Sequence, residues 1–155
     1  MKKEFMLKAI ELSQKHMLAG AGGPFGAVIV KDGRIIGEGW NQVTSTNDPS
    51  AHAEVVAIRN ACKNVNNFDL SGAEIYTSCE PCPMCLSAIY WARIEKIYFG
   101  NTREDAASIN FDDDFIYTEI PKAREERKVK MYQCGHEEAL AVFKQWQEKA
   151  DKISY

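Results

Sequence analysis

Cysteine and histidine residues with the spacing of metal ligands lie at two points in the chain. Cys82 and Cys85 are three residues apart in a Ser-Cys-Glu-Pro-Cys-Pro-Met-Cys run, and His52 lies upstream in an Ala-His-Ala-Glu sequence. Zinc binds thiolate and imidazole ligands, and three protein ligands leave one open position for water, as in catalytic zinc sites. The sequence therefore predicts that His52, Cys82 and Cys85 hold one catalytic zinc ion.

A carboxylate stands next to this predicted metal site. Glu54 follows His52 by two residues, close enough to act as a base toward a water at the open position. Two thiolates and a neutral imidazole cancel the charge of the zinc ion, so Glu54 is not needed as a ligand. A purely structural site has no use for a glutamate at this position, which favours catalysis.

Two predicted helix starts explain how these residues come together. Pro83 suits the first turn of a helix, where its missing N–H costs little, and Cys82 and Cys85 then share one helix face. The positive end of a helix also favours thiolates. A turn over residues 47–50 precedes a second helix that begins near His52, with Ser50 as its candidate cap.

The cysteines could also serve other purposes. Cys79 extends the pair to a Cys-x-x-Cys-x-x-Cys run, but an iron–sulfur site needs a fourth cysteine nearby, and the next one is Cys134. A Cys-x-x-Cys pair can also be a redox pair or half of a structural zinc site, so a non-catalytic zinc or redox module is the alternative class. We expect Cys79 to be structural, and Cys62 and Cys134 to be small core residues.

Composition limits the class of protein. The 155 residues favour one domain, with 45% hydrophobic and 26% charged residues. The net charge of −3 argues against a phosphate backbone as main partner, so no nucleic acid is expected. The segment after Met1 is amphipathic and unlike a signal peptide, and no apolar run approaches the length of a membrane span. These features predict a cytoplasmic protein that binds no membrane.

The spacing of apolar residues predicts an α/β fold. Helices are expected over residues 4–19, 52–63, 83–91 and 137–152, and strands over 25–30, 34–40, 74–77, 94–99 and 128–134. Asp32-Gly33 between the first two strands predicts a hairpin. This order of elements favours a three-layer α/β/α sandwich around a central, mixed, five-stranded sheet.

Three segments carry a resemblance to a known family. Residues 23–30 (Gly-Pro-Phe-Gly-Ala-Val-Ile-Val), 51–54 and 79–85 resemble the zinc-dependent cytidine-deaminase-like superfamily. His-x-Glu followed by Pro-Cys-x-x-Cys is the signature of zinc-dependent nucleobase deaminases. Within this superfamily, Tyr-Trp-Ala-Arg at 90–93 and Phe-Asp-Asp-Asp-Phe-Ile-Tyr at 111–117 are similar to the short bacterial guanine deaminases.

The resemblance implies a reaction, a cofactor and a set of contacts. The reaction is hydrolytic deamination of guanine to xanthine and ammonia, with one Zn²⁺ per subunit activating water and Glu54 moving the protons. The contacts implied for the purine base are Phe25, Asn41, Ala53, Trp91, Asp113 and Tyr155. The C-terminal helix, at about 137–155, is implied to be exchanged between the two subunits of a homodimer.

The substrate assignment leaves alternatives open. A carboxylate suits the two adjacent donors of guanine, the ring N1–H and the 2-amino group, and Asp113 is our choice for this acceptor and for a second catalytic proton relay. Asp112 or Asp114 could take its place, because sequence cannot say which of three consecutive acids points inward. The alternative functions are deamination of adenosine in tRNA, of guanosine or of cytosine.

Overall fold

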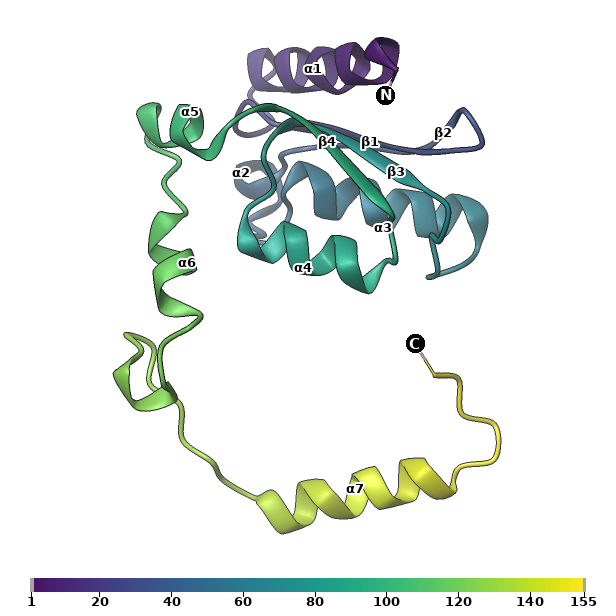
Figure 1. The fold of residues 1–155 in the computed structure, drawn as a ribbon, viewed down its shortest axis with the longest axis vertical. Helices are drawn as coiled ribbons and strands as arrows, with labels where there is room; N and C mark the ends of the chain where they lie inside the picture. The colour runs from purple at the N-terminus through teal and green to yellow at the C-terminus, as the bar shows by residue number, and fades with distance from the viewer. Residues whose placement is uncertain (1, 155) are drawn as a thin grey trace. The chain divides into compact units, whose positions relative to one another are not determined.

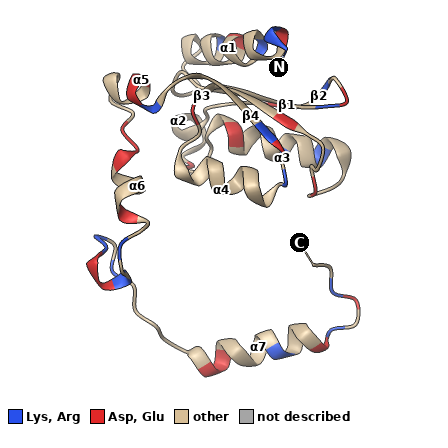
Figure 2. Ribbon diagram, viewed as in Figure 1, with Lys and Arg blue, Asp and Glu red and all other residues tan. Residues whose placement is uncertain are grey.

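The computed structural model describes residues 2–154, which divide into two compact units. The first ends at Phe115 and the second begins at Ile116 (Figure 1). Acidic and basic residues are interspersed along both units (Figure 2). In the described range, no helix has both the length and the apolar character needed to cross a membrane.

A mixed sheet of four strands forms the centre of the first unit. In sequence the strands are β1 (Gly26–Lys31), β2 (Arg34–Trp40), β3 (Glu74–Cys79) and β4 (Lys96–Asn101), and their order across the sheet is β2-β1-β3-β4. β1 pairs antiparallel with both β2 and β3, whereas β3 and β4 are parallel. β3 and β4 can be parallel because a helix connects them, while the short link between β1 and β2 makes a hairpin.

Helices cover both faces of this sheet. α1 (Lys3–Leu18) lies on one face, and α3 (Ala53–Val65) and α4 (Pro83–Trp91) lie on the other (Figure 1). The first core cluster contains Phe5, Leu12, Val28, Val30 and Tyr76. The cluster on the α3 and α4 side includes Ala27, Ile29, Ala57, Ile75 and Ile89. Alternate residues of β1 and β3 therefore enter opposite cores, and the predicted three-layer arrangement is confirmed for the first unit.

The predicted hairpin is also confirmed. Asp32 and Gly33 both have positive φ, 50° and 71°, as a two-residue hairpin turn requires. The register shifts between Ile29 and Val30, so β2 carries a bulge opposite this point.

Two glycines of β2 let α3 approach the sheet closely. A Cβ atom at Gly37 would lie 2.5 Å from the Ala57 carbonyl oxygen, and one at Gly39 would lie 2.2 Å from the Ala53 carbonyl oxygen. Only glycine fits at these positions without a shift of the helix. The close approach sets the N-terminal end of α3, where the His-x-Glu sequence lies, directly against the sheet.

Short helices lie before α3 and after β4. α2 (Val43–Thr46) precedes α3, and α5 (Arg103–Ser108) follows β4 and begins with a capping box formed by Thr102 and Asp105. The sequence did not predict either helix, because segments of four and six residues are too short for a clear apolar period.

The second unit contains no strand among its described residues. α6 (Asp114–Glu119) crosses into it from the first unit, and η1 (Arg124–Glu126) and α7 (His136–Glu148) follow. The prediction of a strand over 128–134 is wrong, and the sheet has four strands where five were expected. The Lys128 N–H donates to a side-chain oxygen of Glu119, and the Lys130 ammonium donates to the Glu125 carbonyl, so this segment bonds to nearby residues and not to a neighbouring strand.

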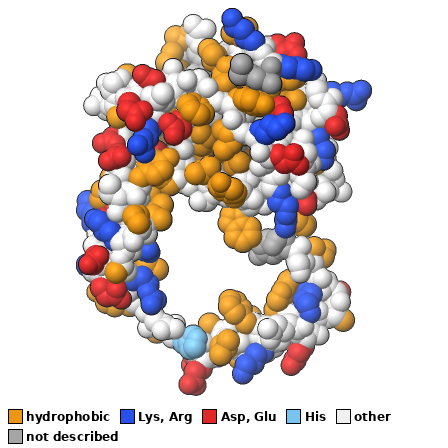
Figure 3. All heavy atoms as spheres, viewed as in Figure 1, with side chains coloured by type: hydrophobic (Ala, Val, Ile, Leu, Met, Phe, Trp, Pro, Cys, Tyr) orange, Lys and Arg blue, Asp and Glu red, His pale blue; other side chains and the backbone are white. Residues whose placement is uncertain are grey.

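Apolar side chains of the second unit are open to solvent. On α7 they include Leu140, Val142, Phe143 and Trp146. Hydrophobic side chains are visible at the surface of α7 and also over part of the first unit (Figure 3). Cys134 is exposed, so its prediction as a core residue is wrong.

Candidate active site

Two helix N-termini carry the predicted metal ligands. His52 is the N-cap of α3 and Cys82 is the N-cap of α4, and both have extended backbones. Neither side chain makes a capping hydrogen bond, so both are available to a ligand. Cys85 lies in the first turn of α4 and is fully buried. The predicted pair of helix starts is confirmed.

The predicted cap of α3 is wrong. The Ser50 hydroxyl donates to Asp48 Oδ1 at 2.7 Å, and the same oxygen accepts the Ser50 N–H at 2.8 Å. This turn satisfies Ser50 locally, two residues before the helix. His52 therefore occupies the cap position. Its imidazole makes no hydrogen bond to the N–H groups of the helix and contacts Cys82 and Cys85 instead.

The three side chains have the spacing of a tetrahedral zinc site. His52 Nδ1 lies 3.5 Å from Cys85 Sγ and 3.6 Å from Cys82 Sγ, and all three ligand atoms lie within 4.8 Å of one another. Tetrahedral zinc with ordinary zinc–sulfur and zinc–nitrogen bonds places its nitrogen and sulfur ligands about 3.6 Å apart. The three residues fit a zinc ion with one position left for water.

The cluster is arranged to supply negative charge to a cation. Hydrogen bonding from Cys85 and His52 lowers the pKa of Cys82 to about 4, so this sulfur is a thiolate at neutral pH. The same contact with Cys82, together with burial, raises the pKa of Cys85, and hydrogen bonding to Cys82 raises the pKa of His52. Without metal the three side chains therefore share protons, which zinc must displace.

Zinc affinity is accordingly expected to fall as the pH falls. The raised pKa of Cys85 means that its thiol keeps a proton at neutral pH, and the raised pKa of His52 lets a second proton compete with the metal at a higher pH than for an ordinary histidine. Because each displaced proton changes the apparent affinity about tenfold per pH unit, the loss should be about tenfold or more per unit. Competition with a chromophoric chelator across the neutral range measures this slope, and an affinity independent of pH would contradict it.

Glu54 lies buried beside the ligands. Its Oε1 accepts a hydrogen bond from the Thr77 hydroxyl at 3.1 Å, and its Oε2 accepts one from Cys85 Sγ at 3.5 Å. Burial raises the pKa of this carboxyl group, which suits a group that must both take up and release a proton. The structure thus brings Glu54 together with the metal ligands.

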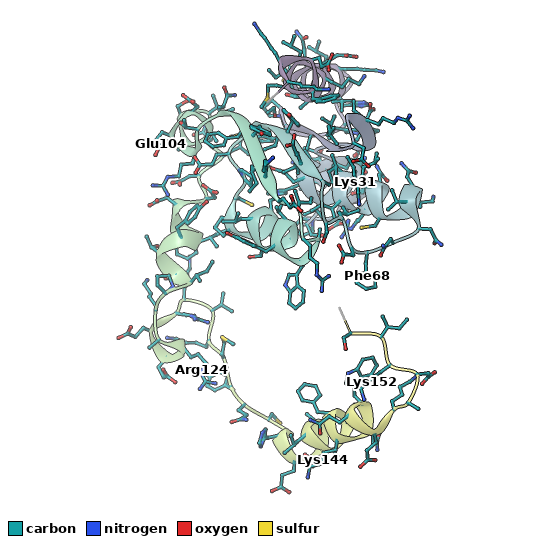
Figure 4. All side chains as sticks on the ribbon, turned by 45° about the vertical axis from the view of Figure 1, so that its right-hand side comes forward. Lys31, Phe68, Glu104, Arg124, Lys144 and Lys152 are labelled. Carbon is teal, nitrogen blue, oxygen red and sulfur yellow. The ribbon has the colours of Figure 1, made fainter. Side chains whose placement is uncertain are left out.

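The loop between β3 and α4 is fastened to the start of α5. Glu80 Oε2 accepts the Arg103 N–H at 3.2 Å, and the Cys79 thiol donates to the Thr102 carbonyl oxygen at 3.5 Å. Burial raises the pKa of Cys79 to about 11, so it stays a neutral thiol outside the ligand cluster. The start of α5 can be found in Figure 4 by the label of Glu104, which lies in the first turn of this helix. The prediction that Cys79 is structural agrees with these contacts.

Of the three consecutive acids, Asp113 is the one that interacts with the cluster. Its charge acts on His52 and on Cys79, while burial, and next the charge of Cys82, raise its own pKa. Asp112 and Asp114 are exposed, and Asp112 Oδ1 accepts the Asp114 N–H at 3.0 Å to begin α6. The sequence alone could not show which of the three acidic side chains lies near the metal ligands.

Phe25 and Asn41 are in contact with each other near the start of β1. Phe25 packs edge-on against Phe111, with ring centroids 4.9 Å apart. The Asn41 N–H donates to the Phe25 carbonyl oxygen, and Asn41 Oδ1 accepts the N–H groups of Gly23 and Val43, each at 3.2 Å. Asn41 is buried, so this amide fixes the loops on either side of it.

The remaining predicted contacts differ in position. Ala53 is fully buried at the first position of α3, between His52 and Glu54. Trp91 is 68% exposed at the end of α4 opposite to Cys82 and Cys85. Tyr155 lies outside the described residues. Sequence reasoning missed Thr77, Glu80 and Phe111, whose roles depend on contacts between elements.

The site and fold define a zinc-binding deaminase. The family model of the cytidine and deoxycytidylate deaminase zinc-binding region matches residues 1–101. The chain belongs to this family, and the predicted resemblance and zinc cofactor are confirmed.

Individual relatives resemble the chain to different extents. A guanine deaminase from Bacillus subtilis is 53% identical over 151 residues, which cover 97% of each chain. The X-ray structure of guanine deaminase from Bacillus subtilis has a TM-score of 0.96 at 52% identity, and the match covers 100% of this chain and 99% of that one. A tRNA-specific adenosine deaminase from Haemophilus influenzae is 42% identical over 118 residues, 73% of this chain and 68% of its own. A structure of guanine deaminase from Nitrosomonas europaea has a TM-score of 0.67 at 31% identity, over 70% of this chain and 63% of its own.

Proposed function

We propose that this protein hydrolyses guanine to xanthine and ammonia. The observation that carries the proposal is the similarity to a guanine deaminase over 97% of the chain, which extends well beyond the zinc-binding region at residues 1–101. The match to a tRNA-specific adenosine deaminase covers 73% of the chain. The guanine deaminase match includes the part of the chain after residue 101, which the zinc-binding family model does not cover.

The reaction exchanges an amino group for an oxygen. Water adds to the ring carbon that bears the 2-amino group, the bond from this carbon to the amino nitrogen breaks, and ammonia leaves. A zinc ion held by His52, Cys82 and Cys85 lowers the pKa of bound water to about 7 when it is present. Glu54 accepts the first proton that the water loses and passes it to the ring. It then takes the proton of the hydroxyl group that has been added to the ring carbon and delivers it to the leaving amino nitrogen, so that ammonia leaves as the new carbonyl group forms.

Other side chains orient the base in this proposal. The Asp113 carboxylate accepts hydrogen bonds from the ring N1–H and the 2-amino group, and beside Glu54 it can act as a second relay for the proton that reaches the leaving amine. The Phe25 ring offers an apolar face to a flat base. Asn41, whose backbone N–H donates to the Phe25 carbonyl oxygen, is a further proposed contact. Ala53, Trp91 and Tyr155 remain contacts proposed from the family resemblance.

Replacing Asp113 with asparagine is expected to lower kcat/KM for guanine about 10- to 100-fold. Asparagine keeps the size but loses the charge, and a hydrogen bond to a charged group contributes about 1.5–3 kcal/mol. Asp112→Asn is the matched control, since its exposed side chain retains the oxygen that accepts the Asp114 N–H. Equal kinetics for the two variants would contradict the role of Asp113.

A substrate panel separates this function from its rivals. Ammonia release is measured from the zinc-loaded protein with guanine, guanosine, cytosine, adenine and a tRNA anticodon hairpin in parallel. The proposal expects turnover of guanine. If the hairpin or a nucleoside is deaminated and guanine is not, the protein is a tRNA or nucleoside deaminase, and the role proposed for Asp113 is wrong.

We also propose that the protein is a homodimer in which the C-terminal helix, at about 137–155, is exchanged between subunits. Its support is the apolar face of α7, where Phe143 is 71% exposed and needs a partner surface. Light scattering is expected to give a dimer, and Phe143→Asp should lower the dimer fraction while Lys144→Asp, at the neighbouring exposed residue labelled in Figure 4, should not. A monomeric wild-type chain would refute this arrangement.

A further inference from the structure

A threonine hydroxyl lies fully buried between the sheet and α3 in the first unit. Thr77 is on β3, is 0% exposed, and is paired across the sheet with Ala27. Ile75, two residues earlier and therefore on the same face of β3, belongs to the core cluster below α3 and α4. The strand pattern alone would place an apolar residue at position 77, because an unpaired buried hydroxyl costs free energy.

The partner of this hydroxyl is the Glu54 carboxylate. Thr77 Oγ1 donates to Glu54 Oε1 at 3.1 Å, from β3 to the first turn of α3. The last torsion of a glutamate side chain is broad and weakly fixed by its own rotamer preference. A hydrogen bond from a rigid strand to one carboxylate oxygen therefore decides how the carboxylate plane is turned.

The two oxygens of Glu54 differ in their surroundings. Oε1 faces Thr77, whereas Oε2 faces Cys85 Sγ at 3.5 Å. The contact with Thr77 is the shorter of the two, and Thr77 is not one of the metal ligands, whereas Cys85 is. Thr77 is therefore the partner that holds the Glu54 carboxylate from outside the ligand set.

We infer that Thr77 is a positioning residue for the proton shuttle, and the inference rests on the function proposed above. Its hydroxyl holds Oε1, so that Oε2 is the oxygen that accepts the proton of water and returns it to the substrate. No bond to Thr77 forms or breaks in the reaction, and the threonine proton stays on Oγ1 throughout. The tether supplies orientation, which matters because small misplacements of a catalytic group lower its rate strongly.

If Thr77 had only a structural role, replacing it with valine would be expected to leave activity unchanged. Valine has nearly the same shape, is well suited to a buried strand, and brings no hydroxyl to be desolvated. If position 77 only filled the core, Thr77→Val would keep both stability and activity. If the hydroxyl orients Glu54, Thr77→Val keeps the fold and the zinc but slows the chemical step.

The test compares Thr77→Val, Thr77→Ser and Thr77→Ala with the wild type. Thr77→Val is expected to lower kcat about 10- to 100-fold with KM changed less than about twofold, and Thr77→Ser, which keeps the hydroxyl, is expected to restore most of kcat. Thr77→Ala removes the hydroxyl a second way if the valine variant does not fold. Thr46→Val is the matched control, since it removes a hydroxyl that donates to the Gln42 carbonyl at 2.7 Å in the exposed α2.

Two further readouts separate this inference from the proposed function. Zinc content should be unchanged in all four variants, and crystal structures of the zinc-loaded variants should show the Glu54 carboxylate turned in Thr77→Val and not in Thr77→Ser. If the wild type turns over another base, kcat is compared on that base, and if it turns over none, the carboxylate orientation still decides. A kcat in Thr77→Val within twofold of wild type, equal losses in the serine and valine variants, or an unturned carboxylate would overturn the inference.

Discussion

Glu54→Gln is expected to lose deamination almost completely while the protein keeps its zinc. Glutamine has the shape of glutamate and can still accept the Thr77 hydroxyl, but it cannot take up the proton of water. General acid–base catalysis of this kind contributes about 10²- to 10⁴-fold, and Glu54 is proposed to act in more than one proton transfer. Ammonia release should therefore fall by at least this range, with zinc content measured on the same sample.

The matched control for this variant is Glu11→Gln. Glu11 is exposed on α1, where it pairs with Lys8 at 3.3 Å, so removing its charge should change stability little and activity not at all. Zinc loss in Glu54→Gln would make Glu54 a metal ligand instead of a proton shuttle. Activity above about a hundredth of wild type, with zinc retained, would remove Glu54 from the mechanism.

Cys85→Ser is expected to lose both zinc and activity. Cys85 is fully buried with its sulfur 3.5 Å from His52 Nδ1, and a serine oxygen replaces the thiolate with a shorter, harder and protonated group. Because zinc binds the folded protein and stabilises it, the variant should also unfold at a lower temperature than the zinc-loaded wild type. Metal analysis after dialysis and a thermal unfolding curve measure the two effects.

Cys79→Ser distinguishes a metal ligand from its neighbour in the same run of cysteines. Cys79 donates to the Thr102 carbonyl oxygen and lies outside the ligand cluster, and a serine hydroxyl can make the same bond. This variant should keep its zinc. Full zinc occupancy in Cys85→Ser, or its loss in Cys79→Ser, would contradict the assignment of the ligands.

The metal ligands could be predicted from sequence because their geometry is local. Helix geometry brings Cys82 and Cys85 to the same face at the N-terminus of α4, and His52 and Glu54 lie within one turn of the start of α3. The element types and the hairpin followed from apolar spacing and from Asp32-Gly33. These features depend on a few consecutive residues.

The features that sequence missed depend on contacts between distant segments. Thr77 reads as an ordinary strand residue until α3 places Glu54 opposite it, and Glu80 reads as a loop acid until the start of α5 reaches it. Residues 128–134 have the polarity pattern of an edge strand, but a strand forms only where a neighbouring strand is available to pair with it, and the sequence pattern does not show this. The polar residue at 77 within a buried strand was the one signal available for the tether to Glu54.

The most direct measurement of the central claim follows the oxygen from water into the product. Guanine is incubated with the zinc-loaded protein in ¹⁸O-labelled water, and the product is analysed by mass spectrometry beside an ammonia assay. The expected product is xanthine that carries one heavy oxygen, with one ammonia released for each xanthine formed. Unchanged guanine, or ammonia released only from another substrate of the panel, would contradict the proposed function.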